Sequence, residues 1–374
     1  MESVGLNTAF WKGKRVFLTG QTGFKGAWLS EMLLALGSTV GGYSLSLPTN
    51  PSLFEQIGLE ERVDHTFGDV RDFAALRASL TKVQPEIVFH LAAQSLVRQS
   101  YINPIETYST NVMGTVHLLE ACRQLDSLSA VVVVTSDKCY ENREWHWGYR
   151  ENEPLGGYDP YSNSKACAEL VTGAYRSSFF GGTSNRGQTG GVSKSGVSVA
   201  SARAGNVIGG GDWGSDRLIP DAIRAFLASR PVEIRSPGAV RPWQHVLEPL
   251  RGYLLLAENL ATHGPEFAEA WNFGPPYRDA KSVEWVVQGL CGRWPSHAEW
   301  TVTTNPQPHE AMNLYLDPSK ANSKLSWWPN LGLEEALDFT CEWYIAYSKG
   351  ADIVKVTRDQ IHTYLTPSKT SENE

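Results

Sequence analysis

The sequence predicts an α/β protein in which a doubly wound parallel Rossmann sheet is followed by a smaller α/β lobe. Two observations carry this prediction. In the first half, short apolar segments alternate with segments of helical length whose apolar residues recur every three or four positions. Glycine-rich and polar motifs follow the apolar segments directly, as expected where the carboxyl ends of parallel strands meet a ligand.

The individual elements can be placed in chain order. Residues 15–19 predict a buried strand, and a helix from Phe24 keeps its apolar side chains at helical spacing until Gly37 ends it. Another strand is expected over 39–45. The remaining elements of the sheet domain are helices over 73–83 and about 111–125, and strands over 87–91, 130–134 and 197–202.

The second half of the chain is less regular. Residues 181–196 are rich in Gly, Ser and Thr and predict a surface loop. From Gly205 onward short segments mix with proline-containing turns, which indicates a separate lobe. We expect a dinucleotide-binding domain over 1–203 with a return segment at about 232–250, a substrate lobe over 204–366 and a polar tail over 367–374.

Composition narrows the function classes. A formal net charge of -7 gives no support to nucleic acid as a partner. No segment reaches the roughly 18 apolar residues of a membrane span, and residues 1–9 lack the basic and apolar regions of a signal peptide. The five cysteines lie far apart with no metal-binding spacing. We therefore expect a cytoplasmic protein without a metal site.

A glycine-rich turn joins the first strand to the first helix. Its glycines allow close backbone approach, and the helix N-terminus presents free N–H groups to a pyrophosphate, so the turn predicts dinucleotide binding. The residues expected to form this part of the site are Gly20, Gln21, Gly23, Phe24, Lys25 and Gly26.

The end of the second strand bears on the choice of cofactor. Residues 43–45 include neither the acidic residue that usually binds the adenosine ribose nor an arginine for a 2′-phosphate, which favours loosely held NAD. Asp69, at the next strand end, fits either an adenine contact or the N-cap of a helix. The further expected cofactor residues are Val70, Leu91, Ala92, Ala93, Tyr161 and Lys165.

Two polar motifs predict acid–base chemistry. Tyr161 and Lys165 are four residues apart and therefore share one helical face, where a lysine ammonium should lower the pKa of the phenol. The tyrosine could then take a hydroxyl proton while hydride leaves for a nicotinamide. Ser136, Asp137 and Lys138 end the strand over 130–134 and add a hydroxyl, a carboxylate and an amine. The combination predicts oxidation, elimination of water and renewed reduction in one site.

With these motifs the chain resembles the nucleotide-sugar 4,6-dehydratases of the extended short-chain dehydrogenase/reductase family. The likeness extends from about residue 11 to residue 344. The motifs that carry it are Gly20-x-x-Gly23-Phe24-x-Gly26, residues 90–94, Asn111, residues 135–138, Tyr161-x-x-x-Lys165 and residues 203–206. Three patterns point to the members that act on CDP-glucose, namely residues 135–140, 205–213 and 241–246.

The resemblance implies a role for each catalytic residue. Tyr161, helped by Lys165 and Ser136, would deprotonate the sugar 4-hydroxyl while hydride passes from C4 to NAD. The ketone formed acidifies the C5 proton, and Asp137 would protonate the departing C6 hydroxyl. Hydride then returns to C6 and C5 is reprotonated, giving CDP-4-dehydro-6-deoxyglucose and regenerated NAD.

Lys138 departs from the dTDP-glucose and GDP-mannose relatives, which have a glutamate there as the C5 base. A lysine is a base only when neutral, and its ordinary pKa is about 10.4. Burial, the nicotinamide cation and Lys165 would all favour the neutral form. The other interpretation is that Lys138 donates a hydrogen bond to the substrate and a water is the base.

The remaining expected contacts belong to the substrate. Asn206, Arg217 and Arg241 would hold the diphosphate, because a guanidinium pairs well with phosphate oxygens. Gln94 and Arg98 are expected at the sugar, His309 at the nucleoside ribose, and Asn111 in support of the catalytic groups.

The family likeness further implies a homodimer or homotetramer and a place in deoxysugar synthesis for surface polysaccharide such as lipopolysaccharide O-antigen. Three alternatives stay open. The same chemistry could act on another nucleotide sugar. A 4-epimerase would need Tyr161 and Lys165 but not Asp137 and Lys138. A non-catalytic dinucleotide-binding regulator would have no need of the Tyr/Lys pair.

Overall fold

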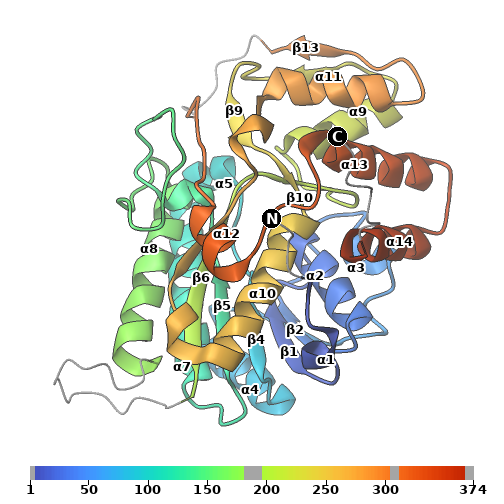
Figure 1. The fold of residues 1–374 in the computed structure, drawn as a ribbon. Coiled ribbons are helices and arrows are strands. Elements are labelled where there is room, and N and C mark those ends of the chain that lie inside the picture. Colours follow the sequence, from blue (N-terminus) through green and yellow to red (C-terminus); the bar gives the residue numbers. More distant parts are fainter. Residues whose placement is uncertain (1–4, 181–195, 304–310, 367–374) are drawn as a thin grey trace, which may run out of the picture.

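The computed structural model describes residues 5–180, 196–303 and 311–366, and a seven-stranded parallel sheet forms its centre (Figure 1). The strand order reverses between β1 and β4, which creates the crevice where ligands bind in doubly wound folds. In spatial order the strands are β11 (Ala270–Phe273), β6 (Ser198–Ala204), β5 (Ala130–Val134), β4 (Ile87–His90), β1 (Arg15–Thr19), β2 (Thr39–Ser44) and β3 (Asp64–Phe67).

Helices cover both faces of the sheet. The five residues of β5 are all buried, with Val131 and Val133 in one hydrophobic core and Val132 and Val134 in the other. This alternation explains why the strand is a continuous apolar run and not a polar–apolar repeat. The helices of the sheet domain are α1 (Thr8–Trp11), α2 (Phe24–Ala35), α3 (Leu53–Gln56), α4 (Phe73–Val83), α5 (Val97–Ile102), α6 (Pro104–Tyr108), α7 (Gly114–Cys122), α8 (Pro160–Tyr175) and α10 (Leu247–His263).

The first-half predictions are confirmed in type and position. β1, β5 and α4 have the expected bounds, and the other strands differ by a few residues. One difference is informative: the helix expected from about residue 111 begins earlier, because α6 continues through a π-helical turn, η1 (Ser109–Met113), into α7.

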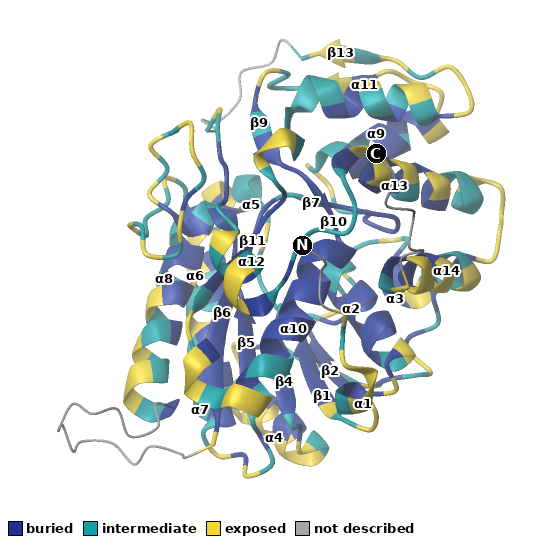
Figure 2. Ribbon diagram, viewed as in Figure 1, coloured by how far each residue is buried: buried dark blue, intermediate teal, exposed yellow. Residues whose placement is uncertain are grey.

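The smaller lobe consists of three two-stranded sheets and surrounding helices (Figures 1 and 2). Its strands are β7 (Val207–Ile208) with β10 (Gln244–His245), β9 (Val240–Pro242) with β12 (Ala280–Ser282), and β8 (Val232–Ile234) with β13 (Trp300–Val302). Its α-helices are α9 (Leu218–Leu227), α11 (Val283–Arg293) and α13 (Leu333–Ser348). Helix α12 (Ser319–Leu325) packs on β11 and α10 of the sheet domain, and α14 (Ile353–Leu365) packs on both α13 and α2.

The chain returns to the large sheet through α10 and β11. Helix α10 packs on β5 and β6, and β11 pairs with β6 in parallel. The segment expected to return, about 232–250, supplies β8, β9 and β10, which pair within the smaller lobe, and then the first residues of α10. The domain boundaries themselves stay a prediction.

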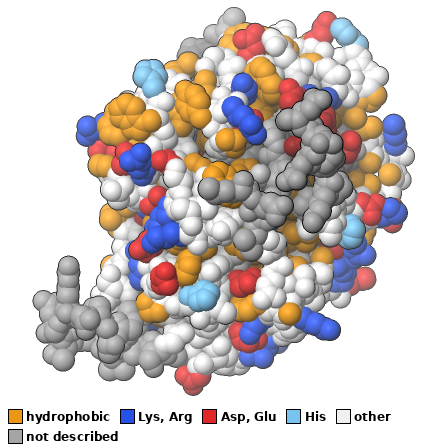
Figure 3. Space-filling model, in the orientation of Figure 1, with side chains coloured by type: hydrophobic (Ala, Val, Ile, Leu, Met, Phe, Trp, Pro, Cys, Tyr) orange, Lys and Arg blue, Asp and Glu red, His pale blue; other side chains and the backbone are white. Residues whose placement is uncertain are grey.

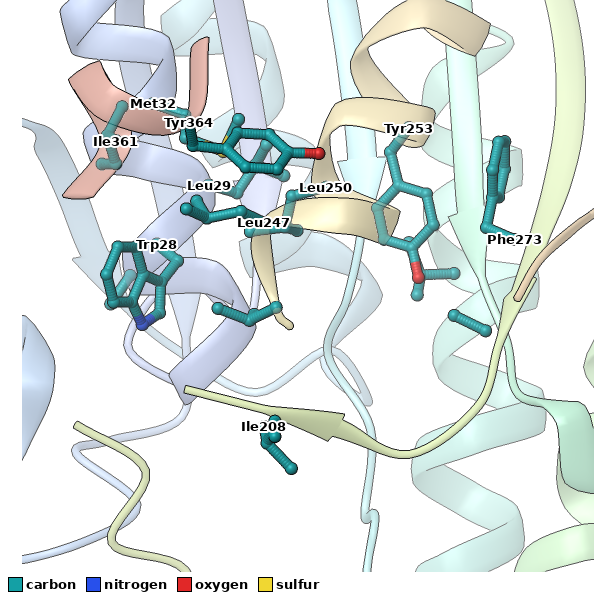
Figure 4. Close-up of a cluster of buried hydrophobic side chains, with 14 of the residues drawn as sticks. Trp28, Leu29, Met32, Ile208, Leu247, Leu250, Tyr253, Phe273, Ile361 and Tyr364 are labelled. Carbon is teal, nitrogen blue, oxygen red and sulfur yellow. The ribbon is translucent and has the colours of Figure 1, made fainter. Parts of the chain in front are cut away.

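Helices α2 and α10 share one apolar interior (Figure 4). Trp28 of α2 and Leu250 and Tyr253 of α10 belong to this cluster, and the Trp28 indole N–H donates to the Gly210 carbonyl at 3.0 Å. The glycine turn before α2 is thereby fixed against both the sheet and the smaller lobe.

Two predicted segments fall on residues outside the described ranges: the loop over 181–196, of which only Gly196 is described, and the tail over 367–374. Within the described part of the chain, no helix combines the length and the hydropathy that a bilayer crossing requires. On the face shown in Figure 3, acidic and basic side chains interleave and neither sign dominates.

Candidate active site

The glycine turn brings the carboxyl ends of β1 and β4 into backbone contact. Gly20 has φ +76°, and a Cβ there would lie 2.8 Å from the Ala92 nitrogen. A Cβ on Gly26 would lie 2.2 Å from the Gly20 carbonyl oxygen. Gly23 is the N-cap of α2 and provides no side-chain cap, so the first N–H groups of this helix face the turn without a capping oxygen. This cradle fits a pyrophosphate.

The end of β2 carries a neutral polar pair in place of a carboxylate. The Ser44 hydroxyl donates to Gln21 Oε1, and it accepts from the Thr22 N–H at 3.3 Å. Gln21 is buried, and its Nε2 has no hydrogen-bond partner among the described residues. A buried donor without a partner is costly, so Gln21 is suited to meet an acceptor such as a ribose hydroxyl.

The Asp69 carboxylate is already hydrogen-bonded to Arg71. The Arg71 Nε donates to Asp69 Oδ2 at 2.8 Å, and the Arg71 backbone N–H donates to Oδ1 at the same distance. Arg71 holds the pKa of this carboxyl below its usual range. The N-cap interpretation of Asp69 is wrong: Asp72 caps α4 and accepts from the Ala75 N–H at 3.0 Å. The adenine contact stays a prediction.

Helix α8 brings Tyr161 and Lys165 to the end of β5. Asp159 caps the helix by accepting from the Ser162 N–H at 2.9 Å, and Pro160 occupies the first turn, where its missing N–H costs nothing. The helix packs against η2 (Asp137–Cys139), the short 3₁₀ turn that follows β5. Ser136, Asp137, Tyr161 and Lys165 are all buried.

The protonation of Tyr161 differs from the expectation. Burial raises its pKa to about 12, and Asp137 acts in the same direction, while the hydrogen bond with Ser136 opposes it. The low pKa predicted for this phenol is wrong for this arrangement, because desolvation of the phenolate outweighs the stabilisation by nearby cations. Lys165 instead donates to the Val134 carbonyl at 3.3 Å.

Asp137 is a buried carboxyl with one oxygen engaged. Its Oδ1 accepts from the Ser136 hydroxyl at 3.0 Å, whereas Oδ2 finds no partner in the described structure. Burial raises the pKa of this carboxyl, against the opposing charges of Lys138, Arg241 and Lys25. A Cβ on Gly205 would lie 3.2 Å from Oδ2, so glycine lets β6 approach the carboxyl closely. Such a group is suited to hold and donate a proton.

Lys25 belongs to the same cluster of charges. Burial and then Lys165 lower its pKa to about 8, while Asp137 raises it. The ammonium lies 5.9 Å from the centre of the Tyr253 ring. The sequence placed Lys25 with the cofactor turn, and the structure adds that its charge reaches the catalytic groups.

The arginines predicted to bind substrate are already paired with acidic or polar groups. Arg217 Nη1 donates to Asp212 Oδ1 at 3.0 Å, and Arg98 Nη1 donates to Asp216 Oδ1 at the same distance. Arg241 is buried, and its guanidinium donates to the Val240 carbonyl at 2.9 Å. Both Arg217 and Arg241 are close enough to the centre to affect its pKa values, Arg217 at Tyr161 and Arg241 at Asp137.

The other residues predicted to contact the substrate are Gln94, Asn206 and His309. The Gln94 amide donates to the Thr107 hydroxyl at 2.9 Å and to the Leu96 carbonyl, so it braces its own turn. The backbone carbonyl of Asn206 accepts a hydrogen bond from the backbone N–H of Gln244 at 3.1 Å. His309 lies outside the described residues. Their substrate contacts stay predictions.

Comparison with known proteins decides the family. The family model described as GDP-mannose 4,6 dehydratase matches residues 17–185. The chain is 55% identical over 357 residues to the CDP-glucose 4,6-dehydratase of Salmonella typhimurium, and the match covers 96% of this chain and 98% of the relative. The chain belongs to the CDP-glucose 4,6-dehydratase family.

Solved structures agree on the fold. The protein MoeE5, in complex with UDP-glucose and NAD, is 26% identical with a TM-score of 0.71, over 89% of this chain and 99% of that one. The dTDP-glucose 4,6-dehydratase of Bacillus anthracis, in complex with NAD, is 21% identical with a TM-score of 0.70, over 91% and 99%.

In this member of the CDP-glucose 4,6-dehydratase family, Asn111 supports the site from the π turn. Its Oδ1 accepts from the Gln94 N–H at 2.8 Å, and its Nδ2 donates to the Ser164 hydroxyl at 2.8 Å. Asn111 thus ties the segment after β4 to the catalytic helix α8. π turns occur often at functional sites, and the supporting role expected for Asn111 agrees with these contacts.

Sequence reasoning missed two buried residues of the centre. Glu169 forms an ion pair with Arg203 at 2.9 Å, and both side chains are 3% exposed. Removing one partner of such a pair costs about 3–5 kcal/mol. The sequence did contain a signal for Glu169, because this residue follows Lys165 at the same four-residue spacing that separates Lys165 from Tyr161.

Tyr253, the second missed residue, gave no sequence signal. It lies in the apolar α10, and in Figure 4 its hydroxyl points away from that helix. The hydroxyl is buried and makes no hydrogen bond to any described residue. Burial and then Asp137 and Tyr161 raise the pKa of this phenol, which places it near the catalytic pair.

A cavity of about 170 Å³ is lined in part by Pro242, and Tyr161 is not among its lining residues. Its aromatic lining, Tyr277 and Tyr315, is stacked with ring centres 5.1 Å apart. The complete lining is Gly148, Pro242, Pro275, Tyr277, Ala280, Tyr315, Leu316, Asp317 and Pro318.

Proposed function

We propose that the protein is an NAD-dependent 4,6-dehydratase that converts CDP-glucose to CDP-4-dehydro-6-deoxyglucose and water. The observation that carries the proposal is the buried Asp137 carboxyl, whose raised pKa suits a proton donor, beside Tyr161 and Lys165. A 4-epimerase has no use for such an acid. The Salmonella relative supports CDP-glucose as the substrate.

The residues divide the proton transfers among them. Bound NAD supplies the hydride acceptor at C4 and the hydride donor at C6. Tyr161 takes the proton of the C4 hydroxyl, and Asp137 gives a proton to the C6 hydroxyl as it leaves. Tyr161 can act as a base only where cations stabilise its phenolate. Lys165, one turn along α8, and Arg217 are the chain's own cations for this task.

Lys138 is assigned the removal of the C5 proton, a task for the neutral amine. Its side chain is the first of the groups that oppose the raised pKa of Asp137, so the two side chains address the same part of the site. An amine beside the acid that releases the C6 hydroxyl is placed for elimination across C5 and C6.

The Lys138→Gln variant is expected to oxidise C4 normally but to lose about 10² to 10⁴ in water elimination, the usual contribution of a general base. NADH absorbance under single turnover reports the first step, and solvent deuterium at C5 in recovered substrate reports the second. Lys82→Gln, a change at a side chain 64% exposed in a pair with Asp64, is the control. Full C5 exchange in Lys138→Gln would mean that a water is the base.

The substrate is tested by incubating the purified protein and NAD separately with CDP-glucose, dTDP-glucose, UDP-glucose and GDP-mannose. Mass spectrometry should find the loss of one water from CDP-glucose alone. Loss of water from another donor would correct the nucleotide. No mass change with any of them, together with demonstrable NAD binding, would favour an epimerase or a binding module.

A homodimer is part of the proposal. Large apolar side chains are exposed on neighbouring helical elements of one side of the sheet, with Ile105 of α6 80% and Ile102 of α5 77% exposed. Exposed apolar side chains on two contacting helices offer a candidate surface for another protein. Light scattering should give the mass of two chains, and Ile105→Glu should give one, whereas Leu45→Glu, at a residue 62% exposed elsewhere, should not. A monomeric wild type would refute the dimer.

We also place the enzyme in the cytoplasm, where nucleotide sugars are made.

A further inference from the structure

Glu169 shares one face of helix α8 with the catalytic pair. It follows Lys165 by one helical turn and Tyr161 by two, so the three side chains lie in line along the helix. Its carboxylate is buried and fully engaged. Oε1 accepts from the Thr135 hydroxyl, and Oε2 accepts from the Ser201 hydroxyl at 2.6 Å and from Arg203 at 2.9 Å.

We propose that Glu169 is a positioning residue whose buried negative charge keeps Lys165 cationic and so sustains proton transfer at Tyr161. The inference rests on the proposed function, because it takes Lys165 as the cation that stabilises the phenolate. It adds a residue that touches neither substrate nor cofactor and acts through another side chain.

Lys165 needs such a partner because burial works against its charge. Burial lowers its pKa to about 8, and Glu169 is the first of the two groups that raise it, followed by Cys139. The group found to accept a hydrogen bond from its ammonium is a neutral one, the Val134 carbonyl at 3.3 Å.

The other groups that face Lys165 cannot replace Glu169. Cys139 of η2 is a neutral thiol at physiological pH, because burial raises its pKa. His90 of β4 is neutral as well, since burial and Lys165 lower its pKa to about 3. Lys25 of α2 carries a like charge. The nearby Asp137 carboxyl is not among the groups that affect the pKa of Lys165. Among these described neighbours, Glu169 is therefore the source of negative charge.

The surroundings of Glu169 keep it ionised although it is buried. Burial opposes its charge, but Arg203, Ser201 and Thr135 together hold its pKa below the usual range. Arg203 is itself fixed by donating to the Tyr140 hydroxyl at 2.7 Å and to the Glu151 carbonyl at 3.1 Å. Thr135 directly precedes Ser136, so the same network also fixes the strand end that carries the catalytic motif.

The test is the pH dependence of kcat/KM for Glu169→Gln with CDP-glucose and NAD. Glutamine preserves the shape and removes the charge. Lys165 acts while protonated, which means below its pKa, so losing the charge that raises this pKa should move the alkaline limb to lower pH. We expect a shift of about one unit, a tenfold change in the protonated fraction. The deficit of the variant should grow with pH and nearly vanish on the acidic side.

Glu31→Gln is the matched control. Glu31 is a buried carboxylate of α2 that pairs with Arg62 and Arg358, and it is not among the charges that affect Lys165. This variant loses a buried ion pair and should be less stable, but its pH profile should keep the wild-type shape. An equal loss at every pH in Glu169→Gln would overturn the proposal, because a purely structural role has that signature.

Two further measurements keep the proposal open to refutation. If Glu169→Gln fails to fold because Arg203 is left buried and unpaired, the double variant Glu169→Gln with Arg203→Met removes both charges. It should shift the alkaline limb in the same direction, because Arg203 is not among the charges that affect Lys165. An unshifted double variant would refute the role of the charge. A wild type that dehydrates none of the nucleotide sugars would instead refute the proposed function.

Discussion

Tyr161→Phe is expected to lose about 10³-fold or more in kcat for CDP-glucose dehydration, within the usual range for removing a general acid–base group. The phenol is the group placed to exchange a proton with the C4 hydroxyl, and phenylalanine keeps its ring and its packing in a buried position. The loss should appear in the first step, so NADH should not form in a single turnover. Stopped-flow absorbance of the nicotinamide is the measurement.

Tyr158→Phe is the control for this variant, since Tyr158 is 82% exposed three residues earlier in the chain. NAD binding, followed by fluorescence quenching, should be similar in both variants and in wild type. If Tyr161→Phe oxidised C4 at a rate close to wild type, Tyr161 would not be the base.

Asp137→Asn is expected to separate oxidation from elimination. Asparagine has the shape of the carboxyl but no acidic proton, so the C6 hydroxyl would leave without help and water loss should fall by about 10² to 10⁴. C4 oxidation does not use this group, so NADH should form and persist instead of being reoxidised. Mass spectrometry combined with nicotinamide absorbance distinguishes the two steps.

The raised pKa of Asp137 also predicts how the rate of elimination should change with pH. The acid acts while protonated, and a raised pKa extends its protonated range toward neutral pH, so elimination should decline as the pH rises through that pKa. The decline should be absent from what activity Asp137→Asn retains. Asp64→Asn, at a carboxylate 52% exposed on β3, should behave as wild type. Complete water loss at a normal rate in Asp137→Asn would assign the proton to another donor.

The sheet could be predicted because its signals are local. Strand β5 is an unbroken run of alanine and valine, and the glycine turn specifies its own contacts, since Gly20 and Gly26 leave no room for a Cβ. The smaller lobe lacked such signals. Its strands are two or three residues long. They can pair with strands far away in the sequence, as β8 does with β13, so no short stretch of sequence reveals the partner.

The residues expected to be catalytic lie together as the motifs predicted, but their charge states could not be predicted from the sequence. The motifs placed Tyr161, Lys165 and Asp137 together, whereas burial determines that the Tyr161 pKa rises to about 12 and the Lys165 pKa falls to about 8. Burial is a property of the packed molecule. For the same reason the sequence suggested Gln94 as a sugar contact, while packing turned its amide toward Thr107.

The π turn over Ser109–Met113 restricts how this chain can change in length. An α-helix turns by about 100° per residue. The number of residues in the π turn therefore sets how α7 is rotated about the helix axis relative to α6. Asn111 faces Gln94 and Ser164 from within the turn, while Leu118 and Leu119 of α7 face the core. Losing one residue here would leave an intact helix but rotate its later part by that angle. A one-residue deletion that a surface loop would tolerate should therefore disturb the core and the catalytic edge together.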